Sequence, residues 1–119
     1  MSFKIAILDE VHYLKSRHSE RSMKLVPVIL WCERVILLTG TPLLSWPNEC
    51  FNVLKMLWPD IFSSFTAFAN RYCNPKKSVH GVDFNGHSNL RELHMILAAR
   101  IMIRRMKIDV LKELPSKRR

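Results

Sequence analysis

Two adjacent carboxylates, Asp9 and Glu10, follow directly after a short apolar run. Acidic side chains at the end of a buried strand lie where open α/β sheets bind their ligands, because the strand ends open into a crevice. In nucleotide hydrolysis, one carboxylate can hold Mg²⁺, usually through water, and a second can orient or deprotonate the attacking water. Such a pair also occurs by chance in many proteins, so its neighbours in the sequence decide what it means.

A second motif stands about 30 residues after the acids, where residues 37–42 read Leu-Leu-Thr-Gly-Thr-Pro. Apolar runs at residues 3–8 and 34–38 predict two short strands of the kind that are buried in a parallel sheet. A helix is expected between them over residues 19–32, with Pro27 either kinking it or marking its first turn. This spacing predicts a right-handed crossover between parallel strands, so both strand-end motifs should face one crevice.

The next part of the chain reads as helical, with one polar interruption. One helix is expected from Pro47 or Asn48 up to Pro59, where proline stops it. Phenylalanine recurs every three residues over residues 62–68, which indicates a short helix that packs in the core. Residues 74–89 are polar and contain proline and glycine, so we expect a surface loop there.

Two more helices are expected near the end of the sequence. The first begins at a cap on Ser88 or Asn89 and runs to about Ala99. Four of its apolar residues should face inward: Leu90, Leu93, Ile96 and Leu97. The second covers residues 101–114, is basic and amphipathic, and ends at Pro115. Together with the strand, helix and parallel strand before them, these helices fit an α/β fold.

Composition restricts the class of protein. Of the 119 residues, 48% are hydrophobic, which fits one globular domain with a modest core. The longest apolar run, residues 26–32, is far shorter than the roughly 20 residues of a membrane span. The net charge is +9, and residues 100–119 hold eight Lys or Arg against two acids, which suits phosphate contacts or a solvated helix face. The three widely spaced cysteines indicate small buried hydrophobes rather than a zinc site or disulfides.

The two strand-end motifs together resemble those of the Snf-type ATPases of helicase superfamily two. Residues 9–12 look like the D-E-x-H Walker B motif, and residues 38–42 look like the L-T-G-T-P motif III. The DEAD and DEAH RNA helicases carry an S-A-T-type motif at the latter position. Further matching blocks are Glu49 with Phe51, Trp58-Pro59-x-x-Phe62, Phe68-x-x-Arg71-Tyr72-Cys73, Ser88-Asn89-Leu90-x-Glu92-Leu93 and Ile103-Arg104-Arg105-Met106-Lys107-x-Asp109-Val110-x-x-x-Leu114-Pro115-x-Lys117. The blocks at residues 71–73 and 88–90 resemble the HepA-related annealing helicases and the zinc-finger RAN-binding-domain annealing helicase in particular.

The resemblance implies a fold and a function. Residues 1–119 would be part of a helicase ATP-binding domain, the later half of a RecA-like lobe (P-loop NTPase fold), with a mainly helical extension over about residues 43–119. The cofactors would be ATP and Mg²⁺. The partner would be DNA, forked or at single-strand/double-strand junctions, in the nucleus and away from membranes. The function would be ATP-dependent translocation and strand annealing in replication-fork repair.

The resemblance also implies roles for single residues. Asp9 would hold Mg²⁺ through water, Glu10 would be the catalytic base, and His12 would link the nucleotide site to motif III. The residues that would couple nucleotide state to DNA contact are Thr39, Gly40 and Thr41, with Gly40 permitting a close or left-handed backbone. Residues that can contact DNA or the other lobe are Lys15, Arg104, Arg105 and Lys107, for which a surface or structural role is an equal alternative.

The sequence departs from the family pattern in two ways. Val11 stands where the family has Ala or Ser, and no G-x-x-x-x-G-K-[ST] phosphate loop is present. Residues 81–88 come nearest to that loop but carry His in place of its Lys. The second lobe with its arginine finger is missing too, so we expect a partial gene product, inactive alone, with an exposed sheet edge.

Two other readings stay open. One is a non-catalytic basic module, derived from a truncated motor, that binds DNA or a protein. The other is an unrelated Mg²⁺-dependent phosphohydrolase that uses Asp9 and Glu10. The second reading requires further acidic ligands at neighbouring strand ends, whereas the next strand is followed by residues 39–41, Thr-Gly-Thr.

Overall fold

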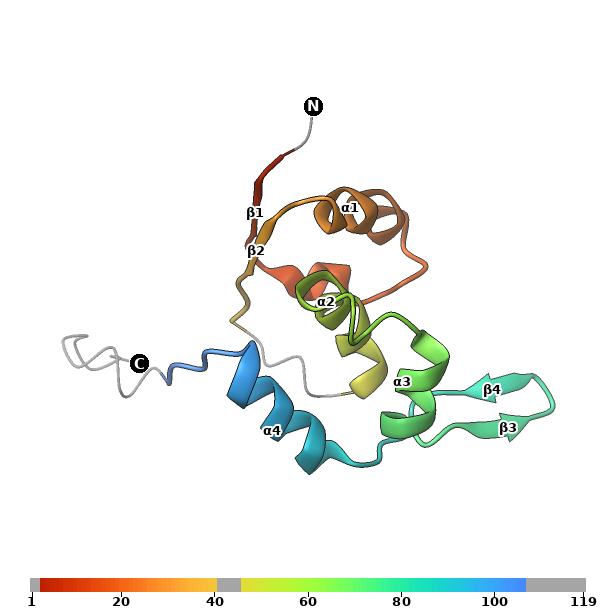
Figure 1. Cartoon of the computed structure of the whole chain (residues 1–119). Helices are drawn as coiled ribbons and strands as arrows, with labels where there is room; N and C mark the ends of the chain where they lie inside the picture. The colour runs from red at the N-terminus through yellow and green to blue at the C-terminus, as the bar shows by residue number, and fades with distance from the viewer. Residues whose placement is uncertain (1–2, 41–45, 107–119) are drawn as a thin grey trace, which may run out of the picture.

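The computed structural model describes residues 3–40 and 46–106 and shows a mixed α/β fold (Figure 1). Strands β1 (Ile5–Leu8) and β2 (Arg34–Leu37) form a two-stranded parallel sheet, and helix α1 (Glu20–Leu30) lies between them in sequence. The register pairs Ile5 with Arg34 and Leu8 with Leu37. The predicted strand, helix and parallel strand are therefore confirmed.

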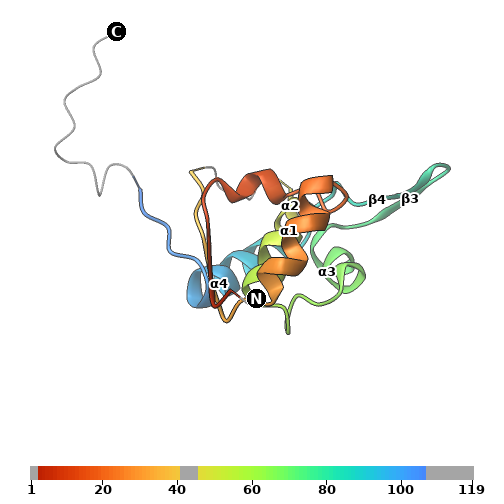
Figure 2. The ribbon, with the colours of Figure 1, turned by 90° about the horizontal axis from the view of Figure 1, so that it is seen from above.

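The sheet is covered on one face only. Ala6, Leu8 and Val35 pack against a buried cluster, whereas Ile5 and Ile7, which point the other way, are 55% and 66% exposed. In Figures 1 and 2, helices α1 and α2 (Pro47–Leu57) lie on the same side of the two strands. The expectation that these strands are buried in a sheet is thus wrong for the described residues, because no described element covers the second face.

Helix α1 begins at a serine cap and continues through its proline. The Ser19 hydroxyl accepts a hydrogen bond from Ser22 N at 3.2 Å, which satisfies one of the free amides of the first turn. Pro27 lies inside the helix and is exposed, and it neither starts nor ends the element. Val26 and Ile29 face the sheet and are buried.

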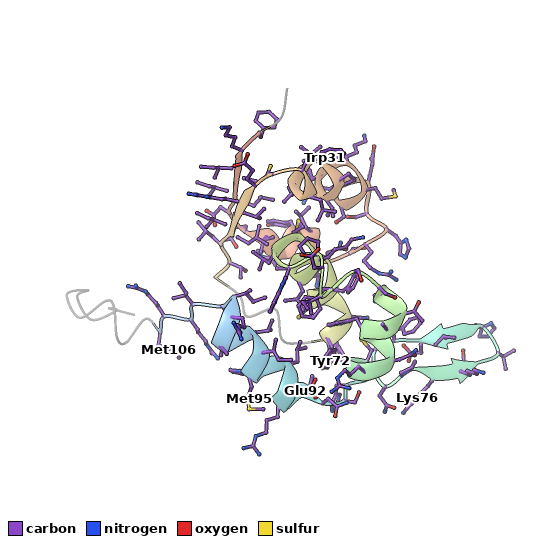
Figure 3. All side chains as sticks on the ribbon, viewed as in Figure 1. Trp31, Tyr72, Lys76, Glu92, Met95 and Met106 are labelled. Atoms are coloured by element: carbon purple, nitrogen blue, oxygen red, sulfur yellow. The ribbon has the colours of Figure 1, made fainter. Side chains whose placement is uncertain are left out.

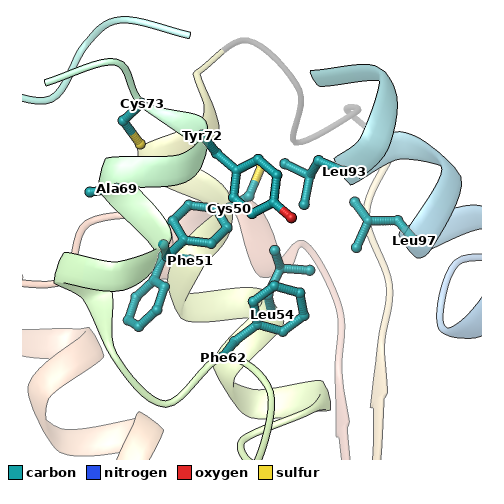
Figure 4. Close-up of a cluster of buried hydrophobic side chains, with 10 residues drawn as sticks. Cys50, Phe51, Leu54, Phe62, Ala69, Tyr72, Cys73, Leu93 and Leu97 are labelled. Atoms are coloured by element: carbon teal, nitrogen blue, oxygen red, sulfur yellow. The ribbon is translucent and has the colours of Figure 1, made fainter. Parts of the chain in front are cut away.

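Helix α2 (Pro47–Leu57) is the centre of the core. Seven of its eleven residues are buried, which is typical of a helix packed on several sides. Val53 and Met56 join the cluster beneath the sheet. Phe51 and Leu54 join a second cluster with helices α3 (Phe65–Tyr72) and α4 (Leu90–Arg100), shown in Figure 4. Because α2 contributes to both clusters, it connects the strands to the later helices.

Residues 74–89, which were predicted to be a loop, contain regular secondary structure. Strands β3 (Lys76–Ser78) and β4 (Gly81–Asp83) form an antiparallel hairpin that projects from the body in both views (Figures 1 and 2). The Ser78 hydroxyl donates to the Gly81 carbonyl at 3.0 Å and supports the turn. All six strand residues are exposed, so the surface location was predicted correctly and the irregular structure was not.

Glycine is required at position 86 by close packing. A Cβ atom there would lie 2.6 Å from the Cys73 carbonyl oxygen and 2.9 Å from that of Asn74. Gly81, in the hairpin, has φ of 122°. These two backbone requirements account for both glycines of the stretch that most resembled a phosphate loop.

Helix α4 buries Leu93 and Leu97, as predicted, but Leu90 is 40% exposed. Leu90 is the first residue of the helix, and its side chain lies beyond the edge of the core. The predicted helix over residues 101–114 is wrong where the structure describes it, because residues 101–106 are not helical. Ile101 N and Met102 N both donate to the Leu97 carbonyl, which closes α4. Residues 107–114 lie outside the described part of the chain.

Candidate functional site

The acidic pair lies at the carboxyl end of β1, where the chain crosses the end of β2. Leu38 N donates to the Leu8 carbonyl at 2.8 Å, and Val11 N donates to the Leu38 carbonyl at 3.0 Å. One bond lies just before the two acids and the other just after them, and both continue the pairing of β1 and β2 beyond the strand ends. The segment containing Asp9 and Glu10 is therefore joined directly to the segment that leads to Thr39.

Glu10 has an uncommon backbone conformation. Its φ of 52° and ψ of 46° place it in the left-handed region, which costs a residue with a Cβ roughly 1–2 kcal/mol. Asp9 Oδ1 accepts from Glu10 N at 2.8 Å, and the Glu10 carbonyl accepts from Tyr13 N at 3.1 Å. These bonds hold the turn and start the 3-10 helix η1 (Val11–Leu14). Strained residues of this kind gather at functional sites, and the sequence carried no signal of this one.

His12 lies beside the Glu10 carboxylate. Its Nδ1 is 3.1 Å from Glu10 Oε2, close enough for an ion pair when the imidazole is protonated. The two groups are not aligned for a hydrogen bond, and Nδ1 is a buried nitrogen without a hydrogen-bond partner in the described structure. The imidazole also contacts the Tyr13 ring, with centroids 4.4 Å apart. His12 thus lies next to the carboxylate of Glu10 without a hydrogen bond to it.

A buried polar contact fixes the other end of η1. The Leu14 carbonyl accepts a hydrogen bond from Asn52 Nδ2 at 2.8 Å and from the Ser22 hydroxyl at 3.2 Å. Asn52 and Ser22 are 5% and 2% exposed, so both bonds form away from solvent. They attach the acidic turn to α1 and α2. Sequence reasoning missed both residues, although a polar side chain between apolar residues on the buried face of a helix is a signal that could have found them.

Lys15 pairs with a carboxylate on α2. Its Nζ lies 3.0 Å from Glu49 Oε1, and both side chains are substantially exposed. Glu49 belongs to one of the sequence blocks singled out above, so two predicted residues meet here. An exposed pair of this kind contributes little stability and leaves Lys15 able to exchange partners.

The other predicted coupling and contact residues are less closely connected to the acids. Gly40 has no described atom within 4 Å of a built Cβ, and its φ is not positive, so neither expected reason for glycine is found. Arg104 and Arg105 are exposed after α4 and pair with no described carboxylate. Thr41 and Lys107 lie outside the described residues.

The carboxylates suit a metal that is held largely by other groups. Among the described residues, no three His, Cys, Asp or Glu side chains gather to form a metal site. Mg²⁺ usually keeps several waters and takes one or two protein carboxylates together with substrate phosphates. Asp9, which is exposed, fits that pattern and can hold Mg²⁺ through water.

Two sequence blocks that lie far apart in the chain form a structural joint. The Arg71 guanidinium donates to both carboxylate oxygens of Glu92. The Tyr72 hydroxyl donates to Glu92 Oε1, and these two residues lie close together in Figure 3. The Ser88 hydroxyl and the Asn89 amide both donate to the Arg71 carbonyl. These contacts join α3 to the start of α4. The Arg71 to Cys73 and Ser88 to Glu92 blocks therefore support the fold.

The cysteines are small packed side chains. Cys50 and Cys73 are buried, Cys32 is half-buried, and none of the three forms a disulfide. Burial is the main reason that the pKa of Cys50 rises to about 12, and it also raises the pKa of Cys73. Both buried thiols stay protonated at neutral pH and are not nucleophiles.

No described helix is both long and apolar enough to cross a membrane.

Comparison with known proteins extends over the whole chain. The SNF2-related domain family matches residues 1–119. The human protein named DNA annealing helicase and endonuclease ZRANB3 is 47% identical over 120 residues, covering 98% of this chain and 11% of that protein. The bovine SWI/SNF-related matrix-associated actin-dependent regulator of chromatin subfamily A-like protein 1 is 43% identical over 115 residues, covering 97% of this chain and 12% of its own length. The chain thus spans about a tenth of the length of these relatives.

Proposed function

Because the chain belongs to the SNF2-related domain family, we propose that it supplies part of an ATP-dependent DNA translocase that anneals strands at forked DNA. It would form the later half of the first RecA-like lobe, in the nucleus. The relative named as an annealing helicase supports this at 47% identity. The observation that carries the proposal is the strained turn that presents Asp9 and Glu10 at the end of β1, bonded to the end of β2.

Glu10 is proposed as the catalytic base. Its carboxylate is 53% exposed and lies beside His12, so it can accept a proton from a water that approaches from solvent. His12 would keep the carboxylate in one orientation through the 3.1 Å contact. Asp9 would hold Mg²⁺ through water, and the ion when bound neutralises charge on the phosphates of ATP.

Coupling to DNA is proposed to pass through the end of β2. The Val11 amide bonds the Leu38 carbonyl, so a shift of the acidic turn moves the backbone that leads into Thr39, Gly40 and Thr41. Contacts with DNA or with the other lobe are proposed for Lys15, Arg104, Arg105 and Lys107. The net charge of +9 favours a phosphate backbone as the partner.

The test is ATP hydrolysis in a polypeptide that joins this chain to a phosphate loop and a second motor lobe. We expect forked DNA to stimulate hydrolysis and Glu10→Gln to reduce it by about 10²–10⁴-fold, the usual contribution of a general base. Glu33→Gln is the matched control, because Glu33 is an exposed carboxylate just before β2. The 119-residue chain alone is expected to be inactive. Equal loss in both variants, or full activity of Glu10→Gln, would remove Glu10 from the mechanism.

A second candidate is a non-catalytic basic module. It is favoured by the eight Lys or Arg of residues 100–119, a concentration of positive charge that attracts an anionic partner. If the joined polypeptide hydrolyses no ATP while the 119-residue chain binds forked DNA, this candidate replaces the motor.

A further inference from the structure

A cleft with basic and apolar walls lies apart from the acidic turn. Its volume is about 320 Å³, near the lower end of the range for small-ligand pockets, which is about 300–1,000 Å³. It lies between the start of α1, the middle of α2 and the start of α3. Neither Asp9 nor Glu10 lines it.

The polar half of the cleft is positively charged without a counter-charge. Arg17, His18 and Lys55 line it, and no Asp or Glu does. Among the described residues, no carboxylate pairs with Arg17 or Lys55, whereas Lys15, Lys24 and Arg71 elsewhere all have acidic partners. A concave site with cations of one sign attracts an anionic partner.

The Arg17 guanidinium is held in a fixed orientation. It stacks over the Phe65 ring, with Cζ 3.3 Å from the ring centroid. Stacking fixes the plane of the group and leaves the N–H donors at its edge available for a carboxylate. Burial lowers the pKa of Arg17, as expected for a cation that is partly desolvated without an acidic partner.

The other half of the cleft is apolar. Met23 and Pro27 on α1 are exposed there, and Val26 and Phe51 form part of the floor. A nucleic-acid backbone would leave this wall unused. An unpaired base cannot stack on the Phe65 face that Arg17 covers, and Phe51 and Phe84 also contact the Phe65 ring in T-shaped geometry. The pairing of cations with an apolar wall instead matches a peptide that carries both acidic and apolar side chains.

We propose that this cleft is a docking site for an acidic, amphipathic peptide segment of a partner protein. A carboxylate of the peptide is bound at the edge of Arg17, a second lies near Lys55, and an apolar side chain packs on Met23 and Pro27. The rigid floor, where Asn52 and Ser22 hold the Leu14 carbonyl, keeps the cleft open in one shape.

The test is the fluorescence anisotropy of a labelled amphipathic peptide with glutamates on one face and leucines on the other, titrated with the 119-residue chain. Lys55→Glu should weaken binding at least about tenfold, since a like charge replaces an opposite one. Lys76→Glu on the projecting hairpin makes the same change of charge outside the cleft (Figure 3) and should weaken binding less than about twofold. A peptide with glutamine in place of glutamate should bind more weakly than the acidic peptide.

A second variant tests the shape of the cleft. Ser63 is an exposed lining residue between helices, so Ser63→Trp should fold normally by circular dichroism and block the peptide. Binding that survives Ser63→Trp overturns the proposal. Equal weakening by Lys55→Glu and Lys76→Glu overturns it in favour of general charge attraction. Single-stranded DNA provides a further test, as a competitor of the peptide. If the DNA displaces the peptide, and its own binding is weakened by Lys55→Glu but not by Lys76→Glu, the cleft is a nucleic-acid site and the proposal is overturned.

Discussion

Arg71 and Glu92 lie 21 residues apart in sequence and form two parallel hydrogen bonds, from Nε to Oε1 at 2.8 Å and from Nη2 to Oε2 at 2.6 Å. This bidentate geometry fixes both side chains and joins the two blocks. Arg71 is the main cause of the lowered pKa of Glu92. The joint therefore depends on Glu92 being ionised.

The first prediction concerns pH. A carboxyl group whose pKa is lower in the folded chain stabilises the fold above its unfolded pKa, about 4.3 for Glu, and loses that contribution as the pH falls through the folded pKa. Glu92→Gln should therefore lower thermal stability at pH 7 and flatten the loss of stability below about pH 4–5. The measurement is the unfolding midpoint across pH, with Glu33→Gln as control. An unchanged acid dependence in Glu92→Gln would contradict the prediction.

The second prediction concerns the buried amide on α2. Asn52→Ala leaves the Leu14 carbonyl with Ser22 as its one remaining side-chain donor among the described residues and should destabilise the fold by about 1–3 kcal/mol. Chemical denaturation measures this change. Asn70→Ala is the control, since Asn70 is exposed on α3. If both variants are equally stable, the contact does not position η1.

The third prediction separates the backbone of Glu10 from its carboxylate. Glu10→Gly removes the left-handed penalty and should stabilise the fold by about 1 kcal/mol relative to Glu10→Ala. Both variants lack the carboxylate, so both should lose hydrolysis in the joined motor polypeptide. Equal stability of the two variants in denaturation would show that the left-handed turn is not present in solution.

The fourth prediction concerns the close contact at Gly86. Gly86→Ala puts a methyl group 2.6 Å from the Cys73 carbonyl oxygen, so the backbone must shift, at a cost of about 1–3 kcal/mol. Gly40→Ala meets no described atom and should change stability by less than about 0.5 kcal/mol. Denaturation of both variants checks the contrast, and a Gly40→Ala variant that is the less stable of the two would reverse the interpretation.

Local patterns predicted the parts of the fold that depend on neighbouring residues. The two apolar runs, the helix between them and the acids at the end of β1 were all predicted from short segments. The contact between the Leu14 carbonyl and Asn52 joins residues 38 apart in sequence, so a local pattern can mark Asn52 as a buried polar residue but cannot identify its partner. The left-handed Glu10 was missed for the same reason, because the bonds around the turn and the parallel sheet impose it.

The hairpin and the end of α4 were missed for different physical reasons. Each strand of the hairpin has three exposed residues, too few to show alternation of apolar and polar side chains. The basic amphipathic pattern of the sequence continues beyond Ile101, but helix α4 ends there. The Leu97 carbonyl accepts the hydrogen bonds that close the helix, and Ile103, which the pattern placed on an apolar face, is 88% exposed. The spacing of apolar and basic residues after Ile101 therefore did not predict the backbone conformation of residues 101–106.

The uncovered face of the two-stranded sheet affects how the chain behaves in solution. Ile5, Ile7 and Ile36 present apolar surface beside strand edges that no described strand pairs with, which is the arrangement that favours self-association. The net charge of +9 opposes it by colloidal repulsion between molecules. Added salt weakens that repulsion while leaving the apolar surface unchanged. The chain should therefore stay soluble in dilute buffer and aggregate as the ionic strength rises.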